Sequence, residues 1–206
     1  ETFEVVPYQS THITWSPAMA EKGGFKHFML KEIHEQPRAL EDTMRGRIDH
    51  EKWDVIESEI GVDAKTAESL KRVYFLACGT SFHASLYGRY LIEALSGVPS
   101  TCELASELVV RDPVLGEGDL IVAVSQSGET IDTLAAVKAA KERGAKVLAL
   151  TNVLDSAIPR ASHGSLYTHA GPEIGVASTK CFTAQLAAMT LLAVYLGRRR
   201  GTLSVE

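Results

Sequence analysis

The sequence predicts a three-layer α/β/α domain built on a five-stranded parallel sheet of order 2-1-3-4-5. From residue 72 onward, short apolar runs alternate with amphipathic stretches of ten or more residues, which is typical of βαβ units. The apolar runs lack strict alternation, as expected when helices cover both faces of a parallel sheet. With 206 residues, of which 45% are hydrophobic, the chain is long enough for one domain and a small appendage.

Two segments precede the expected sheet. Residues 1–24 mix Pro, Gly, Ser and Thr without steady periodicity, which predicts a connector outside the main domain. Residues 25–70 are expected to form a helical arm, because apolar side chains recur close to helical spacing from Phe28 to Ile48. Pro37 should either kink one helix or start a second.

The sheet domain is assigned to residues 71–200, and residues 201–206 are a tail. The most apolar segment, residues 182–197, has 16 residues, which is fewer than the ~20 that a membrane-spanning helix needs, so it is interpreted as a core helix. The expected strands are 72–77, 100–105, 120–125, 146–151 and 165–170. The expected helices are 81–96, 130–143 and 179–197, with shorter ones at 106–110 and 156–161.

The composition argues against several classes of function. A net charge of -5 and a pI near 5.8 disfavour binding to nucleic acid or to a membrane surface. The three cysteines, Cys78, Cys102 and Cys181, lack metal-ligand spacing, and their odd number favours a reducing, cytoplasmic setting. Dinucleotide, P-loop and serine-hydrolase motifs are absent and no histidines are paired, so we expect neither a metal nor a cofactor.

Polar turns follow two of the expected strands. The turn "CGTS", residues 78–81, comes after the first strand, and "SQSGET", residues 125–130, comes after the third. In the order 2-1-3-4-5 these strands are neighbours, so both turns should open on one crevice at the carboxyl ends of the strands. Each turn leads into a helix, whose first N–H groups are free to bind an anion.

The side chains of these turns indicate a site for a phosphate monoester. Such an ester carries about −1.5 to −2 charge and three acceptor oxygens. Hydrogen-bond donors can satisfy it without a lysine. The alternative is that these Ser, Thr and Gly residues only cap helices and form turns, as they do in most proteins. The candidate donors are Thr80, Ser81, Ser125, Gln126, Ser127 and Thr130.

A third segment, "GPEIGVASTKCFT" at 171–183, joins the last strand to the long helix. Gly175 and the small residues after it permit a close backbone approach, and Ser178 or Thr179 can cap the helix. The interpretation that this segment is an ordinary helix cap at a sheet edge is as well supported as a role in ligand binding. Glu173 and Lys180 are expected to be surface charges unless a ligand reaches them.

The motifs "CGTS", "SQSGET" and "EIGVASTK", in this order, resemble the SIS (sugar isomerase) fold. The match is specifically to the first of two SIS subdomains in the glucosamine-6-phosphate synthase family, the isomerizing glutamine:fructose-6-phosphate aminotransferases. The preceding "HFMLKEIHEQP" resembles the segment that links this family's glutaminase domain to its isomerase domain. The resemblance covers about residues 23–200, and three motifs together with the linker make it specific.

The resemblance implies part of an enzyme that makes glucosamine 6-phosphate from fructose 6-phosphate and ammonia released from glutamine. It implies no cofactor, a cytoplasmic location, a homodimeric parent and a hexose 6-phosphate ligand such as fructose 6-phosphate or glucose 6-phosphate. Phosphate contacts would fall on Ser81, Ser125, Gln126, Ser127 and Thr130. Sugar contacts would fall on Thr80, Val176 and Ser178.

Other parts of that family have no counterpart in these 206 residues. They are the glutaminase domain and the second SIS subdomain, which supplies the proton-moving glutamate, a ring-opening histidine and a lysine. The resemblance therefore implies no catalytic residue in this chain, and we expect a hexose-phosphate-binding half of an isomerase that does not catalyse alone. The alternative is a stand-alone SIS module that senses a sugar phosphate. The "KEIHEQP" segment favours the hypothesis that the chain is a part of the synthase.

Overall fold

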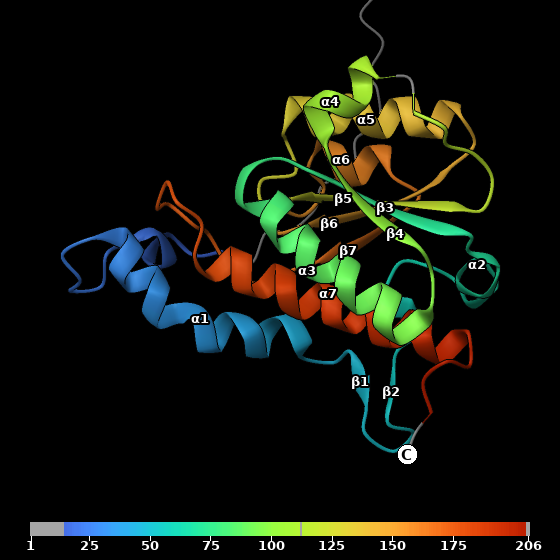
Figure 1. Ribbon diagram of the computed structural model, residues 1–206. Helices are drawn as coiled ribbons and strands as arrows, with labels where there is room; N and C mark the ends of the chain where they lie inside the picture. The colour runs from blue at the N-terminus through green and yellow to red at the C-terminus, as the bar shows by residue number, and fades with distance from the viewer. Residues whose placement is uncertain (1–14, 112, 205–206) are drawn as a thin grey trace, which may run out of the picture.

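The computed structural model describes residues 15–111 and 113–204. It has three layers around a five-stranded parallel sheet, with helices on both faces (Figure 1). The strand order β4-β3-β5-β6-β7 is the predicted order 2-1-3-4-5. The strands are β3 (Arg72–Ala77), β4 (Ser100–Leu104), β5 (Asp119–Ser125), β6 (Lys146–Thr151) and β7 (Gly164–Tyr167).

The two faces of the sheet have separate apolar cores. All seven residues of the central strand β5 are buried; Val122 and Val124 belong to one core, whereas Ile121 and Ala123 belong to the other. This explains why the apolar runs lack strict alternation. Helices α3 (Gly79–Ser96) and α7 (Lys180–Arg199) cover the first face, and α4 (Ala105–Val110), α5 (Ile131–Glu142) and α6 (Ala157–Ala161) cover the second (Figure 1).

Among the observed boundaries that differ from the sequence expectation, two lie close to the carboxyl ends of the strands. Helix α3 begins at Gly79 rather than at residue 81, so its first turn includes most of the "CGTS" motif. Strand β7 ends at Tyr167 rather than at residue 170, because the amides of His169 and Ala170 donate to side chains instead of to the β6 backbone. The amide of Ala170 donates to Asn152 Oδ1 at 2.9 Å, and Thr168 Oγ1 donates to the same oxygen at 3.1 Å.

The arm before the sheet contains one continuous helix, α1 (Phe28–Met44), which runs along α7 (Figure 1). Pro37 lies inside this helix and starts no second one. Proline cannot donate to the carbonyl of Ile33, and that carbonyl accepts instead from the Gln36 side chain at 3.1 Å. The buried residues of α1 are Glu32, Ala39 and Thr43, so its buried face is not the apolar stripe from which the helix was predicted.

Short elements complete the described chain. The 3₁₀ helix η1 (Pro17–Ala20) precedes α1, and the connector expected at residues 1–24 lies mostly outside the described residues. After α1, the hairpin of β1 (Ile48–Asp49) and β2 (Asp54–Val55) is followed by η2 (Glu57–Glu59) and α2 (Ala64–Ser69). The sequence did not predict this hairpin, because two-residue strands are too short to show a period of two.

Helix α7 is the core helix that was expected. Among the described residues it is the one helix long and apolar enough to cross a membrane, yet 72% of its apolar window is buried inside the protein. It packs against α3 on one side and α1 on the other. Gly88 of α3 allows the close approach to α7, because a Cβ there would lie 2.6 Å from Met189 Sδ and 2.9 Å from Phe75 Cζ.

Replacing Gly88 with alanine should therefore overpack the interface between α3, α7 and the sheet. We expect Gly88→Ala to lower the free energy of unfolding by about 1–3 kcal/mol, although alanine favours the helix itself. Chemical denaturation measures this change. Gly116→Ala is the control, because a Cβ there would have its nearest neighbour at 3.9 Å. Equal stability of the two variants would contradict the packing argument.

Candidate functional site

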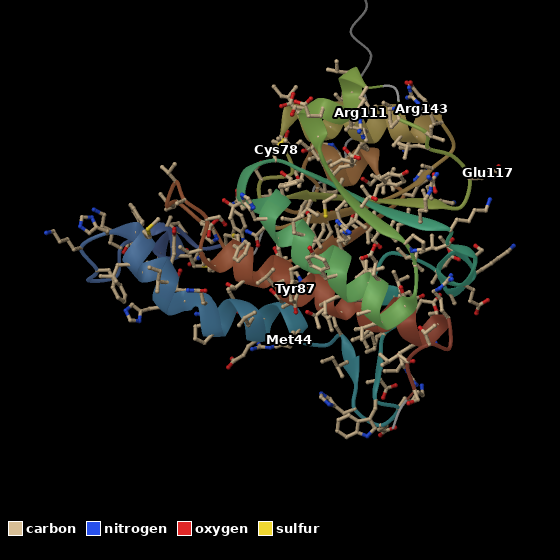
Figure 2. All side chains as sticks on the ribbon, in the orientation of Figure 1. Met44, Cys78, Tyr87, Arg111, Glu117 and Arg143 are labelled. Carbon is tan, nitrogen blue, oxygen red and sulfur yellow. The ribbon has the colours of Figure 1, made fainter. Side chains whose placement is uncertain are left out.

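All eight residues predicted to contact a ligand line one pocket of about 220 Å³ at the carboxyl ends of β3 and β5. Figure 2 shows this end of the sheet at Cys78, which follows β3, whereas Glu117, which precedes β5, lies at the opposite end. Three separate chain segments form the wall. They contribute Cys78, Thr80 and Ser81; Val124, Ser125, Gln126, Ser127 and Thr130; and Glu173, Gly175, Val176 and Ser178.

The turn after β5 keeps its shape through its own hydroxyl groups. Gly128 donates its amide hydrogen to Ser125 Oγ at 3.1 Å, and Ser125 Oγ lies 2.9 Å from Thr130 Oγ1. Ser127 Oγ accepts from the Glu129 amide at 3.2 Å. Gly128 has a φ of 66°, and a Cβ there would lie 1.9 Å from Ser156 Oγ, so the turn requires glycine.

The pocket lies between the amino ends of two long helices. Within the described residues, the amides of the first three residues of α3 and of α5 have no hydrogen-bond partner; the first helical bonds start at Phe82 and Leu134. These amides carry the partial positive charge of a helix terminus. The pocket-lining residues include no lysine, arginine or histidine, so neutral donors dominate the site.

Gln185 of α7 is a further candidate residue that sequence reasoning missed. Its side chain is 2% exposed, and its Nε2 donates to Ser81 Oγ at 3.0 Å. Because Ser81 Oγ accepts this hydrogen bond, its own proton is free to be donated into the pocket. A glutamine inside the otherwise apolar segment at 182–197 was the available signal, since a buried amide needs a partner.

Glu173 corrects the expectation for the start of α7. Neither Ser178 nor Thr179 caps this helix with its side chain. The Glu173 carboxylate does so, accepting from the Thr179 amide at 2.9 Å and from the Cys181 amide at 3.1 Å, and it also accepts from Ser178 Oγ at 2.9 Å. The amino end of α7 is therefore occupied by a carboxylate and is not available to a phosphate.

Lys180 is also not a surface charge, which is the second correction in this segment. Its side chain is 3% exposed, and its Nζ lies 2.8 Å from Glu35 Oε2 of α1. A buried ammonium group needs such a partner because of the cost of leaving water. The next residue, Cys181, is equally buried, and desolvation together with nearby Glu173 raises the pKa of its thiol far above the ordinary value. Cys181 is therefore a core residue and not a nucleophile.

A larger pocket of about 320 Å³ lies between α1 and the ends of β6 and β7. Its central polar side chain, Asn152, is already satisfied, because Nδ2 donates to the Gly171 carbonyl at 2.8 Å and Oδ1 accepts two hydrogen bonds. Its charged groups Arg38 and Asp42 pair with each other at 3.4 Å. The smaller pocket is the better candidate because it retains unused donors. No cluster of three or more metal-ligating side chains occurs in the described part of the chain.

In a comparison with known protein families, residues 68–195 match the SIS domain family. An isomerizing glutamine–fructose-6-phosphate aminotransferase from Symbiobacterium thermophilum is 54% identical over 198 residues, covering 96% of this chain and 32% of that protein. A relative of the same name from Clostridium tetani is 48% identical over 195 residues, covering 95% and 32%. The chain thus spans about a third of the length of the curated relatives it matches.

A solved structure supports the same relationship. The C-terminal domain of glucosamine-fructose-6-phosphate aminotransferase from Francisella tularensis aligns with a TM-score of 0.83 at 37% sequence identity. The alignment covers 90% of this chain and 51% of that chain. This chain is therefore similar to about half of that domain.

The hydrogen bond from Gln185 generates a prediction about anion binding. Gln185→Leu keeps a similar volume but removes the donor to Ser81, and Gln185→Glu replaces the donor with an acceptor that competes for the Ser81 proton. We expect inorganic phosphate to bind about threefold to tenfold more weakly to the leucine variant, and more weakly still to the glutamate variant. An NMR titration measures this order. Equal phosphate affinities of the unsubstituted chain and the two variants would contradict the proposed role of Gln185.

Proposed function

Because this chain belongs to the SIS domain family, we propose that it binds a hexose 6-phosphate as one part of an isomerizing glutamine–fructose-6-phosphate aminotransferase. The observation that carries this proposal is one pocket formed by three distant segments, in which the side-chain hydrogen-bond donors are all uncharged. The identities of 54% and 48% to relatives of that name support the choice of enzyme.

The phosphate is proposed to lie between the amino ends of α3 and α5. Hydrogen bonds to a charged group contribute about 1.5–3 kcal/mol each and are not additive, so a few neutral donors suffice for micromolar to millimolar affinity. Ser81, Ser125, Gln126, Ser127 and Thr130 are the proposed phosphate contacts.

The sugar is proposed to extend toward the loop before α7. Thr80 and Ser178 line the same pocket, and Val176 is fully exposed at its rim. Glu173 holds Ser178 Oγ as a donor, so this oxygen keeps lone pairs to accept from a sugar hydroxyl. Thr80, Val176 and Ser178 are the proposed sugar contacts.

The complete enzyme is proposed to make glucosamine 6-phosphate from fructose 6-phosphate and glutamine, in the cytoplasm and without a cofactor. Ring opening and proton transfer each require a positioned acid or base. The pocket-lining residues include neither histidine nor lysine, and Glu173 is already used to cap α7. We propose that a second SIS subdomain supplies the acid and base, that a glutaminase domain supplies ammonia, and that the enzyme is a homodimer.

Ser127 provides a direct test of the phosphate site. We expect Ser127→Ala to weaken binding of glucose 6-phosphate about tenfold, because one hydrogen bond to a charged group is lost. Calorimetry measures the affinity, with Ser69→Ala as a matched control on α2, where the hydroxyl is exposed and bonds its own helix. An unchanged affinity would count against this contact, and an equal response to unphosphorylated fructose would refute the phosphate site itself.

The composition of the pocket generates a second prediction. The 206-residue chain, as a polypeptide of its own, should form no glucosamine 6-phosphate from fructose 6-phosphate with either glutamine or an ammonium salt. The physical reason is that the pocket lining includes no histidine or lysine, and that its one carboxylate, Glu173, is already used to cap α7. A coupled assay for glucosamine 6-phosphate measures this, and any turnover above the uncatalysed rate would show that the acid and base lie within this chain.

A further inference from the structure

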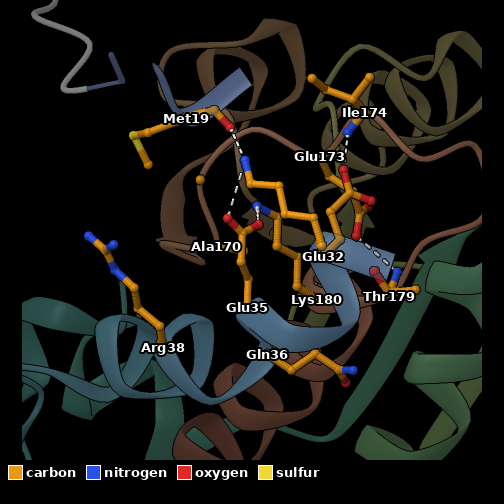
Figure 3. Close-up of polar contacts among 12 residues, drawn as sticks. Met19, Glu32, Glu35, Gln36, Arg38, Ala170, Glu173, Ile174, Thr179 and Lys180 are labelled. Atoms are coloured by element: carbon orange, nitrogen blue, oxygen red, sulfur yellow. Dashed lines mark hydrogen bonds and ion pairs between the residues drawn. The ribbon is translucent and has the colours of Figure 1, made fainter. Parts of the chain in front are cut away.

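Helix α1 places a buried carboxylate against the loop that forms the sugar side of the pocket. The Glu32 side chain is 2% exposed, and its Oε1 accepts from the Ile174 amide at 2.6 Å and from the Gly175 amide at 3.0 Å (Figure 3). Gly175 itself lines the pocket, and Val176 follows it at the rim. One side chain from an element outside the sheet therefore contacts the backbone of the proposed sugar-binding loop.

The contact between Glu32 and Gly175 has little steric tolerance. A Cβ at residue 175 would lie 2.5 Å from Glu32 Oε2 and 3.6 Å from the Cα of Met29, so a larger residue would displace the Glu32 carboxylate from its present position. No cation pairs with Glu32 among the described residues; its hydrogen-bond partners are the two amides. A buried carboxylate is costly unless it is hydrogen-bonded, so this carboxylate is a specific acceptor for the loop.

The far end of the same loop is also held by α1. Lys180, the first residue of α7, lies 2.8 Å from Glu35, which is one helical turn after Glu32 (Figure 3). Lys31 Nζ joins this cluster at 3.4 Å from Glu35 and donates to the Met19 carbonyl at 2.6 Å. Both ends of the segment from residue 174 to residue 180 are therefore fixed to one turn of α1, whereas the fully exposed Val176 side chain contributes no packing of its own.

We propose that Glu32 is a positioning residue for the sugar side of the pocket and that it couples the placement of α1 to hexose binding. The proposal rests on the proposed function, because it concerns the same ligand. Glu32 acts through the amides of Ile174 and Gly175, which set the position of Val176 and Ser178. Among the described residues, Glu32 forms no hydrogen bond with the turns after β3 and β5. The phosphate donors on those two turns should therefore not depend on Glu32.

The test separates the two sides of the pocket with two ligands. In the 206-residue chain, Glu32→Ala should weaken binding of glucose 6-phosphate about tenfold but change the affinity for inorganic phosphate less than about twofold. NMR titrations measure both affinities. Glu41→Ala is the matched control, since Glu41 is an exposed glutamate of the same helix. A merely structural role for Glu32 would lower both affinities together with stability, and that result would overturn the proposal.

A conservative variant covers the case in which Glu32→Ala does not fold. Glu32→Gln keeps Oε1 as an acceptor for both amides, but it places an NH₂ group where Oε2 faces the Gly175 amide at 3.2 Å. We expect it to fold and to bind glucose 6-phosphate about twofold to fivefold more weakly than the unsubstituted chain, with unchanged affinity for inorganic phosphate. An unchanged affinity for both ligands, or equal losses for both, would contradict the positioning role.

The outcomes distinguish this inference from the proposed function. If the unsubstituted chain binds neither ligand, the proposed function fails and the inference fails with it. If it binds glucose 6-phosphate and Glu32→Ala binds it as well as Glu41→Ala does, only the positioning role fails. Slower hydrogen exchange of α1 amides with glucose 6-phosphate, and not with inorganic phosphate, is the reciprocal effect that coupling requires.

Discussion

The pairing of β3 with β5 is the constraint on which the site depends. The two strands are parallel neighbours in register, with Arg72 opposite Asp119 at one end and Ala77 opposite Val124 at the other. At the amino end the pair is reinforced by two hydrogen bonds of 3.0 Å from the Arg72 guanidinium to the buried Asp119 carboxylate. Because the strands end level with each other, the turns that follow them meet at one rim of the sheet, and two helices begin there.

That geometry explains how an acidic protein can offer an anion site without a cation. The free amides belong to the first turns of α3 and α5, and the hydroxyl groups belong to the two turns that lead into them. At the amino end of the third helix that begins nearby, α7, the Glu173 carboxylate already accepts from the amides of Thr179 and Cys181. The pocket thus has an electropositive side formed by α3 and α5 and a side shaped by carboxylates.

The arm before the sheet has a closer relation to the pocket than a simple connector would have. Its helix α1 buries Glu32 and Thr43 rather than its larger apolar residues, and Thr43 Oγ1 accepts from the His169 amide at 3.3 Å. These polar contacts have defined directions, whereas apolar packing alone would tolerate sliding along α7. Helix α1 therefore makes directional contacts with the loop between β7 and α7, and this loop completes the pocket.

The sequence alone predicted the five strands of the parallel sheet, their order and the two turns. Apolar runs that alternate with helical stretches, and turn chemistry, are properties of local sequence. Strand order, which places the turns of β3 and β5 together, also predicted six of the residues that line the pocket, whereas Val176 and Ser178 were expected only from the family resemblance. Only the tertiary structure revealed that Lys180 is buried, that Glu173 caps α7, that Gln185 donates to Ser81, and that Glu32 accepts from Gly175. Glu32 and Gly175 are 143 residues apart, and no local pattern in either segment specifies the partner. Long-range polar contacts of this kind depend on how α1 packs against α7, which hydrophobic period and turn chemistry do not encode.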